Sequence, residues 1–228
     1  MLYLVGMGLE PGDMTLKGRE AVLKAGKVFI ETYTSMPYDI GDLQKEITSV
    51  DREFVEKGDL LELAGTADVV LLIPGDPLFA TTHISLMKEA RDKAIPLQVC
   101  HAPSVINTLS HTGLSPYKFG RIITLSKPFP SDREKLEANL KAGLHTLCLL
   151  DPIISLSDGL RVLQDFGVTQ KVVACQQLGM KTQTIHYGTI TDLLPLSFSK
   201  KPCCLLVPAD LHFFEEEFLN QFIHNKSC

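Results

Sequence analysis

Three short segments, each following an apolar run, hold residue types that could bind or transform a small molecule. Gly6-Met7-Gly8 lets the main chain approach a ligand, because glycine has no side chain. Gly75-Asp76-Pro77 places a carboxylate on a backbone that cannot continue as helix, and His101-Ala102-Pro103-Ser104 offers an imidazole and a hydroxyl. If the apolar runs are parallel strands, all three segments lie at the carboxyl edge of one sheet, where open α/β sheets bind ligands.

Each segment also has a purely structural interpretation. Gly6-Met7-Gly8 begins like a dinucleotide-binding turn, with Glu31 where a ribose-binding acid would stand, but Pro11 replaces the third glycine and disfavours nicotinamide binding. Asp76 is equally suited to closing a turn. Ser104 is expected to cap a helix, with a ligand contact through its main chain as an added hypothesis.

His83 ends the segment Ala80-Thr81-Thr82-His83 and is the candidate proton acceptor, although a hydrogen-bonded structural histidine fits the pattern too. The seven histidines show no HExxH or other paired spacing, so no metal site is predicted. No GxSxG or GxxxxGK[ST] motif occurs, which disfavours the serine hydrolases and P-loop enzymes that carry them.

Composition narrows the class of protein further. With 45% hydrophobic and 21% charged residues the chain is typical of a globular protein, and a formal charge of −5 disfavours a nucleic-acid binder. No apolar run approaches about 18 residues, and the N-terminus lacks a basic leader, so neither a membrane span nor a secretory signal is expected. Five of the six cysteines lie in or beside apolar runs, which predicts buried thiols in a reducing compartment, the cytoplasm.

Alternating strand and helix patterns position the three segments. Strands are expected at 2–6, 27–31, 67–73 and 96–100, and helices at 15–25 and 82–93. The run at 67–73 is almost continuously apolar, as in a parallel strand that is buried on both faces. The first half is therefore predicted to be an α/β domain with a mainly parallel sheet.

The second half is predicted to be a mixed α/β domain. Two glycines and a proline in 113–120 interrupt the pattern, and the domains are placed at 1–114 and 115–228. Strands are expected at 121–126, 145–150, 172–175, 184–187 and 203–207, with helices at 131–143, 155–166 and 213–224. The stretches 184–187 and 203–207 are expected to be antiparallel neighbours.

Several strings, spread in order over nearly the whole chain, carry a resemblance to a known family. They are GMGL (6–9), TLKG (15–18), ETYTS (31–35), DRE (51–53), GDPLFATTH (75–83), HAPS (101–104), YKFG (117–120), GLHTLCLLD (143–151) and VPADLHFFEEEFL (207–219). The chain resembles the tetrapyrrole-methylase fold family of S-adenosylmethionine-dependent methyltransferases, and within it the branch that acts in diphthamide biosynthesis.

The resemblance implies two αβα domains that close around a bent methyl donor, S-adenosyl-L-methionine, with the donor site in the cleft between them. It also implies a homodimer without metal, which methylates the amino group of a modified histidine on translation elongation factor 2. The donor-binding positions that it implies are Leu9, Asp76, Phe79, Ser104, Val105, Leu150, Leu178 and Cys203. The chain departs from the family pattern at Phe79, where a small residue is expected, at Cys203, where a histidine is expected, and in a shorter stretch between 151 and 172.

Two alternatives stay open. A methylase of the same fold that acts on a corrin-type ring shares GDP but is not expected to carry ATTH, HAPS and YKFG together. A non-catalytic module that binds the donor is suggested by Phe79 and Cys203. No catalytic residue beyond the candidate His83 is identified, and the sequence does not determine whether methylation stops at the trimethylated amine or continues to an ester.

Overall fold

The computed structural model describes residues 1–35, 37–38 and 43–223 and divides into two compact units, Met1–Asn107 and Thr108–Cys228. The sequence placed the division after residue 114. Gly113 shows why the chain there belongs to the second unit, because a Cβ at this glycine would lie 2.4 Å from Cδ1 of Phe218. The segment 113–120 is thus packed into the second unit instead of linking the two.

The sheet of the first unit is wholly parallel. Its strands are β1 (Leu2–Gly6), β2 (Lys27–Glu31), β3 (Ile47–Val50), β4 (Val69–Ile73) and β5 (Leu97–Cys100), in the order β3-β2-β4-β1-β5. Every neighbouring pair runs parallel, so all five carboxyl ends lie at one edge. This confirms the predicted α/β class and the predicted parallel sheet.

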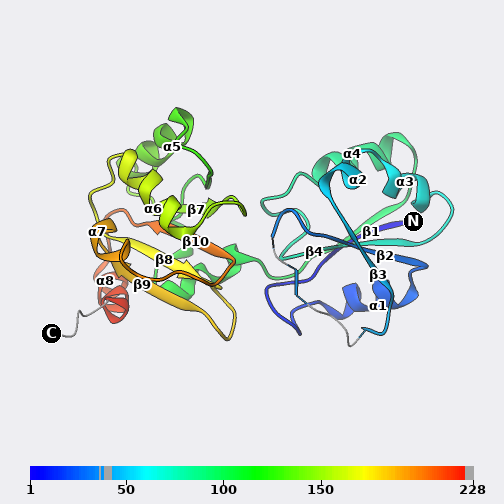
Figure 1. Ribbon diagram of the computed structural model, residues 1–228, viewed down its shortest axis with the longest axis horizontal. Helices are drawn as coiled ribbons and strands as arrows, with labels where there is room; N and C mark the ends of the chain where they lie inside the picture. The colour runs from blue at the N-terminus through cyan, green and yellow to red at the C-terminus, as the bar shows by residue number, and fades with distance from the viewer. Residues whose placement is uncertain (36, 39–42, 224–228) are drawn as a thin grey trace. The chain divides into compact units, whose positions relative to one another are not determined.

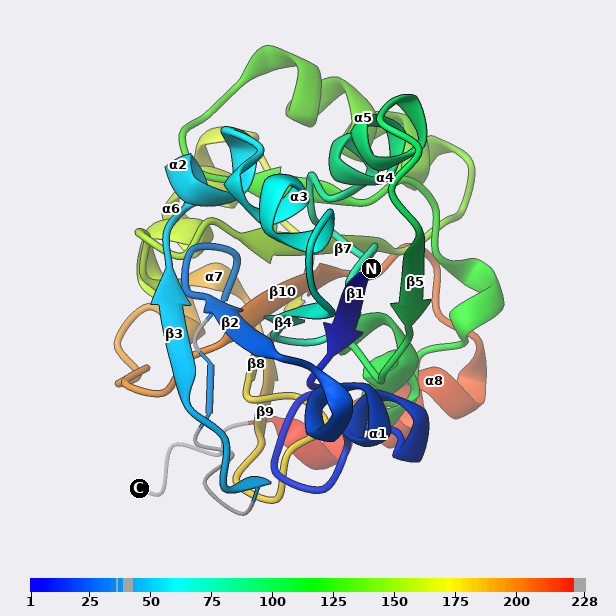
Figure 2. The same ribbon diagram turned by 90° about the vertical axis from the view of Figure 1, so that its right-hand side faces the viewer.

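Helices cover both faces of this sheet (Figures 1 and 2). On one face lies α1 (Leu16–Lys24), and on the other lie α2 (Arg52–Glu56), α3 (Asp59–Ala64) and α4 (Ile84–Asp92). The central strand β4 therefore consists of five buried apolar residues, as a strand covered on both faces requires.

The neighbouring strands β1 and β4 form a topological switch point. The helix that follows β1, α1, covers one face, and the helix that follows β4, α4, covers the other. Open α/β sheets bind ligands beside the carboxyl ends of the strands at such a point. The loops that contain Gly6-Met7-Gly8 and Gly75-Asp76-Pro77 both begin there.

The sheet of the second unit is mixed, as predicted. Its strands are β6 (Ile123–Leu125), β7 (Thr146–Leu150), β8 (Val172–Gln176), β9 (Thr184–Gly188) and β10 (Cys203–Val207), in the order β6-β7-β10-β8-β9. Among the neighbouring pairs of these five strands, β6 and β7 run parallel and the other three pairs run antiparallel. The expected pairing of 184–187 with 203–207 is wrong, because β8 lies between β9 and β10 and is antiparallel to both.

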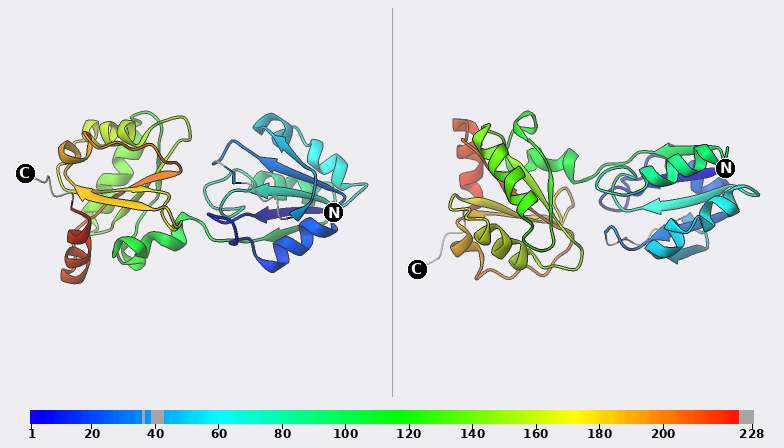
Figure 3. Two further views of the ribbon diagram at one scale, coloured as in Figure 1. Left: turned by 60° about the horizontal axis from the view of Figure 1, so that its bottom comes forward. Right: turned by 90° about the horizontal axis from the view of Figure 1, so that it is seen from above.

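Helices also flank the second sheet (Figures 1 and 3). On one face lie α5 (Pro130–Lys141), α6 (Leu156–Asp165) and α7 (Ile190–Leu193), which share one apolar core with the strands. On the other side lies α8 (Phe213–Leu219), which continues as a 3-10 turn at Asn220–Phe222. The last helix is shorter than the predicted 213–224, whose final residue lies outside the described chain. No helix within the described ranges is long and apolar enough to cross a bilayer.

Candidate functional site

The loops after β1 and β4 are hydrogen-bonded to each other. The main-chain N–H of Gly8 donates to the Gly75 carbonyl at 3.2 Å, and the N–H of Gly75 donates to the Gly8 carbonyl at 2.8 Å. A Cβ at Gly6 would lie 2.7 Å from the Gly75 oxygen and 2.8 Å from Cβ of Ala102. Glycine at position 6 therefore lets the loops after β1, β4 and β5 pack together.

Asp76 ties the second of these loops to the third. Its Oδ1 accepts from the N–H of Leu78 at 2.9 Å, while Oδ2 accepts from Nδ1 of His101 at 2.8 Å and from the N–H of Ala102 at 3.3 Å. The side chain is 15% exposed. The structure thus places a mostly enclosed carboxylate at the switch point, as the sequence predicted, and gives it partners that the sequence did not reveal.

The other donor positions predicted in the first unit lie on the same three loops. Leu9 follows Gly8, and its N–H donates to the Asp13 carboxylate at 2.9 Å. Phe79 lies in the loop after β4, with its N–H 3.3 Å from the Asp76 carbonyl. Ser104 is buried immediately before the 3-10 helix Val105–Thr112. These residues all lie near the carboxyl edge of the first sheet.

Ser104 occupies the N-cap position of this helix, because its carbonyl accepts from the N–H of Asn107 at 3.0 Å. Its own N–H donates to the side-chain oxygen of Asn107 at 2.9 Å, so the asparagine side chain closes the turn from the other end. Sequence reasoning missed Asn107 in this role. It also missed Asp13, which closes the first loop by accepting from the N–H groups of Leu9 and Glu10. In both cases the signal was available, since Asn and Asp side chains often bond main-chain groups three or four residues earlier in the chain.

The donor positions predicted in the second unit share one edge of its sheet. Leu150 ends β7, Leu178 lies just after β8, and Cys203 begins β10 opposite Gln176 of β8. Because β10 is antiparallel to β7 and β8, its first residue lies beside their last ones. The Sγ of Cys203 is 2.8 Å from the Lys200 carbonyl, and burial raises the pKa of this thiol to about 11. Cys203 is therefore a neutral thiol and not a nucleophile.

His83 is buried, with both ring nitrogens engaged. Only 1% of the residue is exposed, and Nδ1 lies 3.0 Å from the Pro77 carbonyl. Nε2 lies 3.1 Å from the Tyr33 hydroxyl. Since a carbonyl can only accept, Nδ1 carries the proton and Nε2 accepts from Tyr33. Burial lowers the pKa of His83, so the ring is neutral and has the features of a structural histidine.

The hydrogen bonds that the structure describes for the Glu31 side chain are all to residues close to it in the sequence. Its carboxylate accepts from the hydroxyl of Thr34 and from the Thr34 N–H at 3.3 Å, and the residue is fully buried. Burial raises its pKa. A side chain enclosed in this way is not presented to a ribose, which removes the remaining support for nicotinamide binding.

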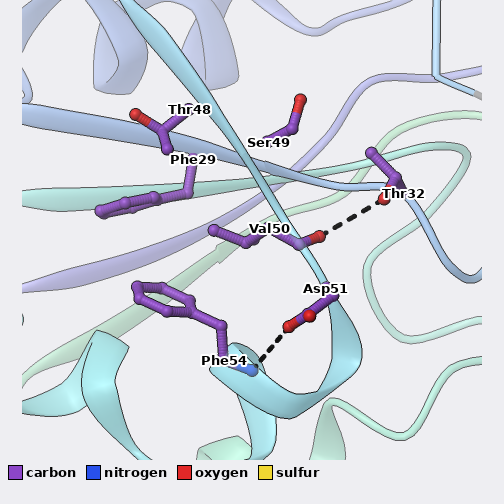
Figure 4. Close-up of a pocket in the computed structure, with 7 residues that line it drawn as sticks. All are labelled: Phe29, Thr32, Thr48, Ser49, Val50, Asp51 and Phe54. Carbon is purple, nitrogen blue, oxygen red and sulfur yellow. Dashed lines mark hydrogen bonds between the residues drawn. The ribbon is translucent and has the colours of Figure 1, made fainter.

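A hollow of about 450 Å³ lies beside the ends of β2 and β3 (Figure 4). Phe29 and Phe54, whose ring centroids are 5.3 Å apart, form its apolar part. Its other lining residues are Thr32, Thr48, Ser49, Val50 and Asp51. None of the predicted donor-binding residues lines this hollow. Among residues 1–35, 37–38 and 43–223, no group of three His, Cys, Asp or Glu side chains is placed to hold a metal ion.

Comparison with known proteins defines the class. Residues 1–194 match the model of the Tetrapyrrole (Corrin/Porphyrin) Methylases, and the chain belongs to this family. With its parallel and mixed sheets it has the fold that the resemblance implied, and it is an S-adenosylmethionine-dependent methyltransferase.

The curated relatives of this chain are named for one particular methyl-transfer reaction within the family. The chain is 34% identical over 254 residues to a diphthine synthase of Methanococcus maripaludis strain S2, covering 99% of this chain and all of the relative. It is 33% identical over 278 residues to a probable diphthine methyl ester synthase of Arabidopsis thaliana, covering 100% of this chain and 99% of the relative.

Solved structures agree with these relatives. A crystal structure of diphthine synthase superposes with a TM-score of 0.91 at 29% identity, covering 97% of this chain and 95% of the other. A putative diphthine synthase from Entamoeba histolytica gives a TM-score of 0.87 at 28% identity, with 99% of each chain covered.

Proposed function

We propose that this methyltransferase has diphthine synthase activity and methylates the amino group of the modified histidine on translation elongation factor 2. The observation that carries the proposal is similarity to diphthine synthases over the whole length of the chain, in both sequence and fold. A corrin-ring methylase is disfavoured because relatives that match this chain over their whole length include diphthine synthases and a probable diphthine methyl ester synthase.

The residues of the first unit suit S-adenosyl-L-methionine as the donor. The donor carries a positively charged sulfur and an aromatic base. The Asp76 carboxylate at the switch point offers a negative charge, and the side chains of Leu9, Phe79 and Val105 on the neighbouring loops offer apolar contacts. We include Leu150, Leu178 and Cys203 of the second unit among the donor contacts. Phe79 and Cys203 differ from the residues that the family pattern leads one to expect, but a different side chain does not remove contacts that the donor makes with the main chain.

The chain contributes alignment and exclusion of water to the reaction. When bound, the donor supplies a methyl group on a sulfonium centre, and the product is S-adenosyl-L-homocysteine. Transfer to an amine is an in-line displacement, and correct positioning supplies up to roughly 7–11 kcal/mol of the barrier reduction. The amine must lose its proton before it attacks, and His83 is not the acceptor, because both of its nitrogens have partners.

The proposal extends to assembly and location. We propose a homodimer, which light scattering of the purified protein would test against the 25.2 kDa chain. We also propose that the protein acts in the cytoplasm with its protein substrate. Cys100, Cys148, Cys175 and Cys204 are buried free thiols, which agrees with a reducing compartment, whereas Cys228 lies outside the described residues.

The deciding experiment is the intact mass of elongation factor 2 that carries the aminocarboxypropyl-histidine intermediate, after incubation with this protein and S-adenosyl-L-methionine. A gain of whole methyl groups on that residue is expected. Mild alkali removes an ester methyl but leaves N-methyl groups, so the mass before and after alkali separates the trimethylated amine from its ester. No gain in a sample that binds the donor would contradict the proposal and favour a ring methylase or a non-catalytic module.

A further inference from the structure

The loop after β4 has an unusual backbone conformation. Ala80 has φ of +56°, a left-handed value that side chains other than glycine rarely adopt. Such a conformation persists only where surrounding contacts hold it. The Pro77 carbonyl is the centre of these contacts, because it accepts from Nδ1 of His83 at 3.0 Å and from the Thr81 hydroxyl at 2.7 Å.

His83 joins this loop to the end of β2. Its second nitrogen accepts from the Tyr33 hydroxyl at 3.1 Å, and the two rings meet edge to face with centroids 6.3 Å apart. The guanidinium of Arg52 lies over the Tyr33 ring, 5.1 Å from its centroid. The strings ATTH, ETYTS and DRE, which no donor contact uses, thus meet around one imidazole.

Pro77 links this cluster to the candidate donor site. A Cβ at Gly6 would lie 2.9 Å from Cδ of Pro77, so the proline ring packs directly against the last residue of β1, where the first loop begins. The next residue back along the chain is Asp76, whose carboxylate bonds the loop after β5. A hydrogen bond that holds the Pro77 carbonyl in place therefore also holds the three loops that carry the first unit's donor residues in their positions relative to one another.

We propose that His83 is a positioning residue, which holds the Pro77 carbonyl and thereby sets the loop after β4 in the conformation that binds the methyl donor. It takes no part in proton transfer. The inference rests on the proposed function in one respect, since the ligand of the loop is taken to be S-adenosyl-L-methionine.

Two substitutions of His83 test its two hydrogen bonds one at a time. His83→Asn retains an N–H close to the position of Nδ1, which can donate to the Pro77 carbonyl, but cannot reach Tyr33. His83→Gln places its amide near the position of Nε2, beside Tyr33, and leaves the carbonyl without this donor. Tyr33→Phe removes only the hydroxyl.

The readouts are donor affinity by calorimetry and the rate of single-turnover methyl transfer at saturating donor. His83→Gln is expected to raise the Kd of the donor about tenfold, because a buried carbonyl loses a hydrogen bond, while His83→Asn and Tyr33→Phe change the Kd less than about threefold. The transfer rate at saturating donor is expected to stay within about threefold in all three variants, because no proton passes through His83. His212→Asn, which replaces the N-cap residue of α8 with another good N-cap residue, serves as the control and should leave both readouts unchanged.

Three results would overturn the inference. Equal loss of affinity in the Asn and Gln variants would show that the bond to Pro77 is not decisive. Normal affinity in His83→Gln would remove the positioning role, and a large drop in the transfer rate with normal affinity would make His83 a catalytic base. If His83→Gln does not fold, Thr81→Val replaces it, because it removes the other hydrogen bond to the same carbonyl and should also weaken donor binding.

The proposed function can fail separately. If the wild-type protein binds the donor but transfers no methyl group to elongation factor 2, only the function is contradicted, and the affinities still decide the role of His83. If the wild-type protein does not bind S-adenosyl-L-methionine at all, both are overturned.

Discussion

The Asp76 carboxylate illustrates how one side chain joins two loops that lie far apart in the sequence. The sequence placed an acid at the end of an apolar strand, which is enough to predict its position at the sheet edge. Its bonds to His101 and Ala102 follow from the adjacency of β4, β1 and β5, which local pattern does not encode. Asp76 is therefore both a candidate donor contact and a structural tie.

Replacing Asp76 tests both roles. Asp76→Ala removes the acceptor for Leu78, His101 and Ala102, and we expect the Kd of S-adenosyl-L-methionine to rise about tenfold to a hundredfold, measured by calorimetry. Asp92→Ala is the matched control, since this aspartate pairs only with Lys88 on the surface of α4 among the described contacts. Unchanged affinity in Asp76→Ala would remove Asp76 from the donor site.

At the scale of elements, one buried carboxylate bonds α8 to several segments of the second unit. Glu215 lies in the first turn of α8, and its side chain is 5% exposed. It accepts hydrogen bonds from the N–H groups of Ser115 and His212, from Nζ of Lys118 and from Nε2 of His145. The strings YKFG, GLHTL and VPADLHFFEEEFL meet in this network, which gives them a structural role separate from the donor.

We expect Glu215→Gln to lower the free energy of unfolding by about 2–4 kcal/mol, because glutamine replaces one acceptor oxygen with a donor amide and leaves Lys118 without its ion-pair partner. Urea unfolding followed by circular dichroism measures the change. Glu217→Gln, on the exposed side of the same helix, should change the free energy of unfolding by less than about 0.5 kcal/mol. A Glu215→Gln variant as stable as the wild type would show that the network is not required to hold α8.

The stability of this network depends on pH in a defined direction. Burial alone would raise the pKa of Glu215, but its hydrogen bonds lower it to about 2, below the ordinary value of 4.5. Its contribution is therefore complete above about pH 4.5 and is lost as the pH falls toward 2. Burial lowers the pKa of His145 from 6.5, so the unfolded chain takes up a proton that the folded chain does not, and stability also falls below about pH 6.5. The difference between wild type and Glu215→Gln should be largest above pH 4.5 and shrink below it.

At the scale of the whole molecule, each of the two units has its own sheet and core, and each carries part of the predicted donor set. We expect S-adenosyl-L-methionine to slow amide hydrogen exchange in both units, around residues 6–9 and 75–79 in the first and around 150 and 178 in the second, because bound ligand stabilises every segment that it contacts. Exchange measured by mass spectrometry at saturating donor tests this. Protection confined to the first unit would exclude Leu150, Leu178 and Cys203 from the donor contacts.

The sequence by itself determined the class of each sheet, the order of most elements and the family. Buried parallel strands such as β4 are recognisable as continuous apolar runs, and glycine and proline mark where such strands end. The strand β3 escaped prediction, because two of its four residues are exposed and it carries no apolar alternation.

Only the tertiary structure decided which strands are neighbours and which polar groups meet. The strand β8 lies between β9 and β10, so the order of the strands in the sheet differs from their order in the chain. The bond of His101 to Asp76 and the bond of Tyr33 to His83 each join residues that are 25 or more positions apart. Local propensity acts over a few residues, whereas these contacts depend on how whole strands pair and on which loops then share an edge. For this reason the sequence could name His83 as a candidate, and only the fold could show that both of its nitrogens already have partners.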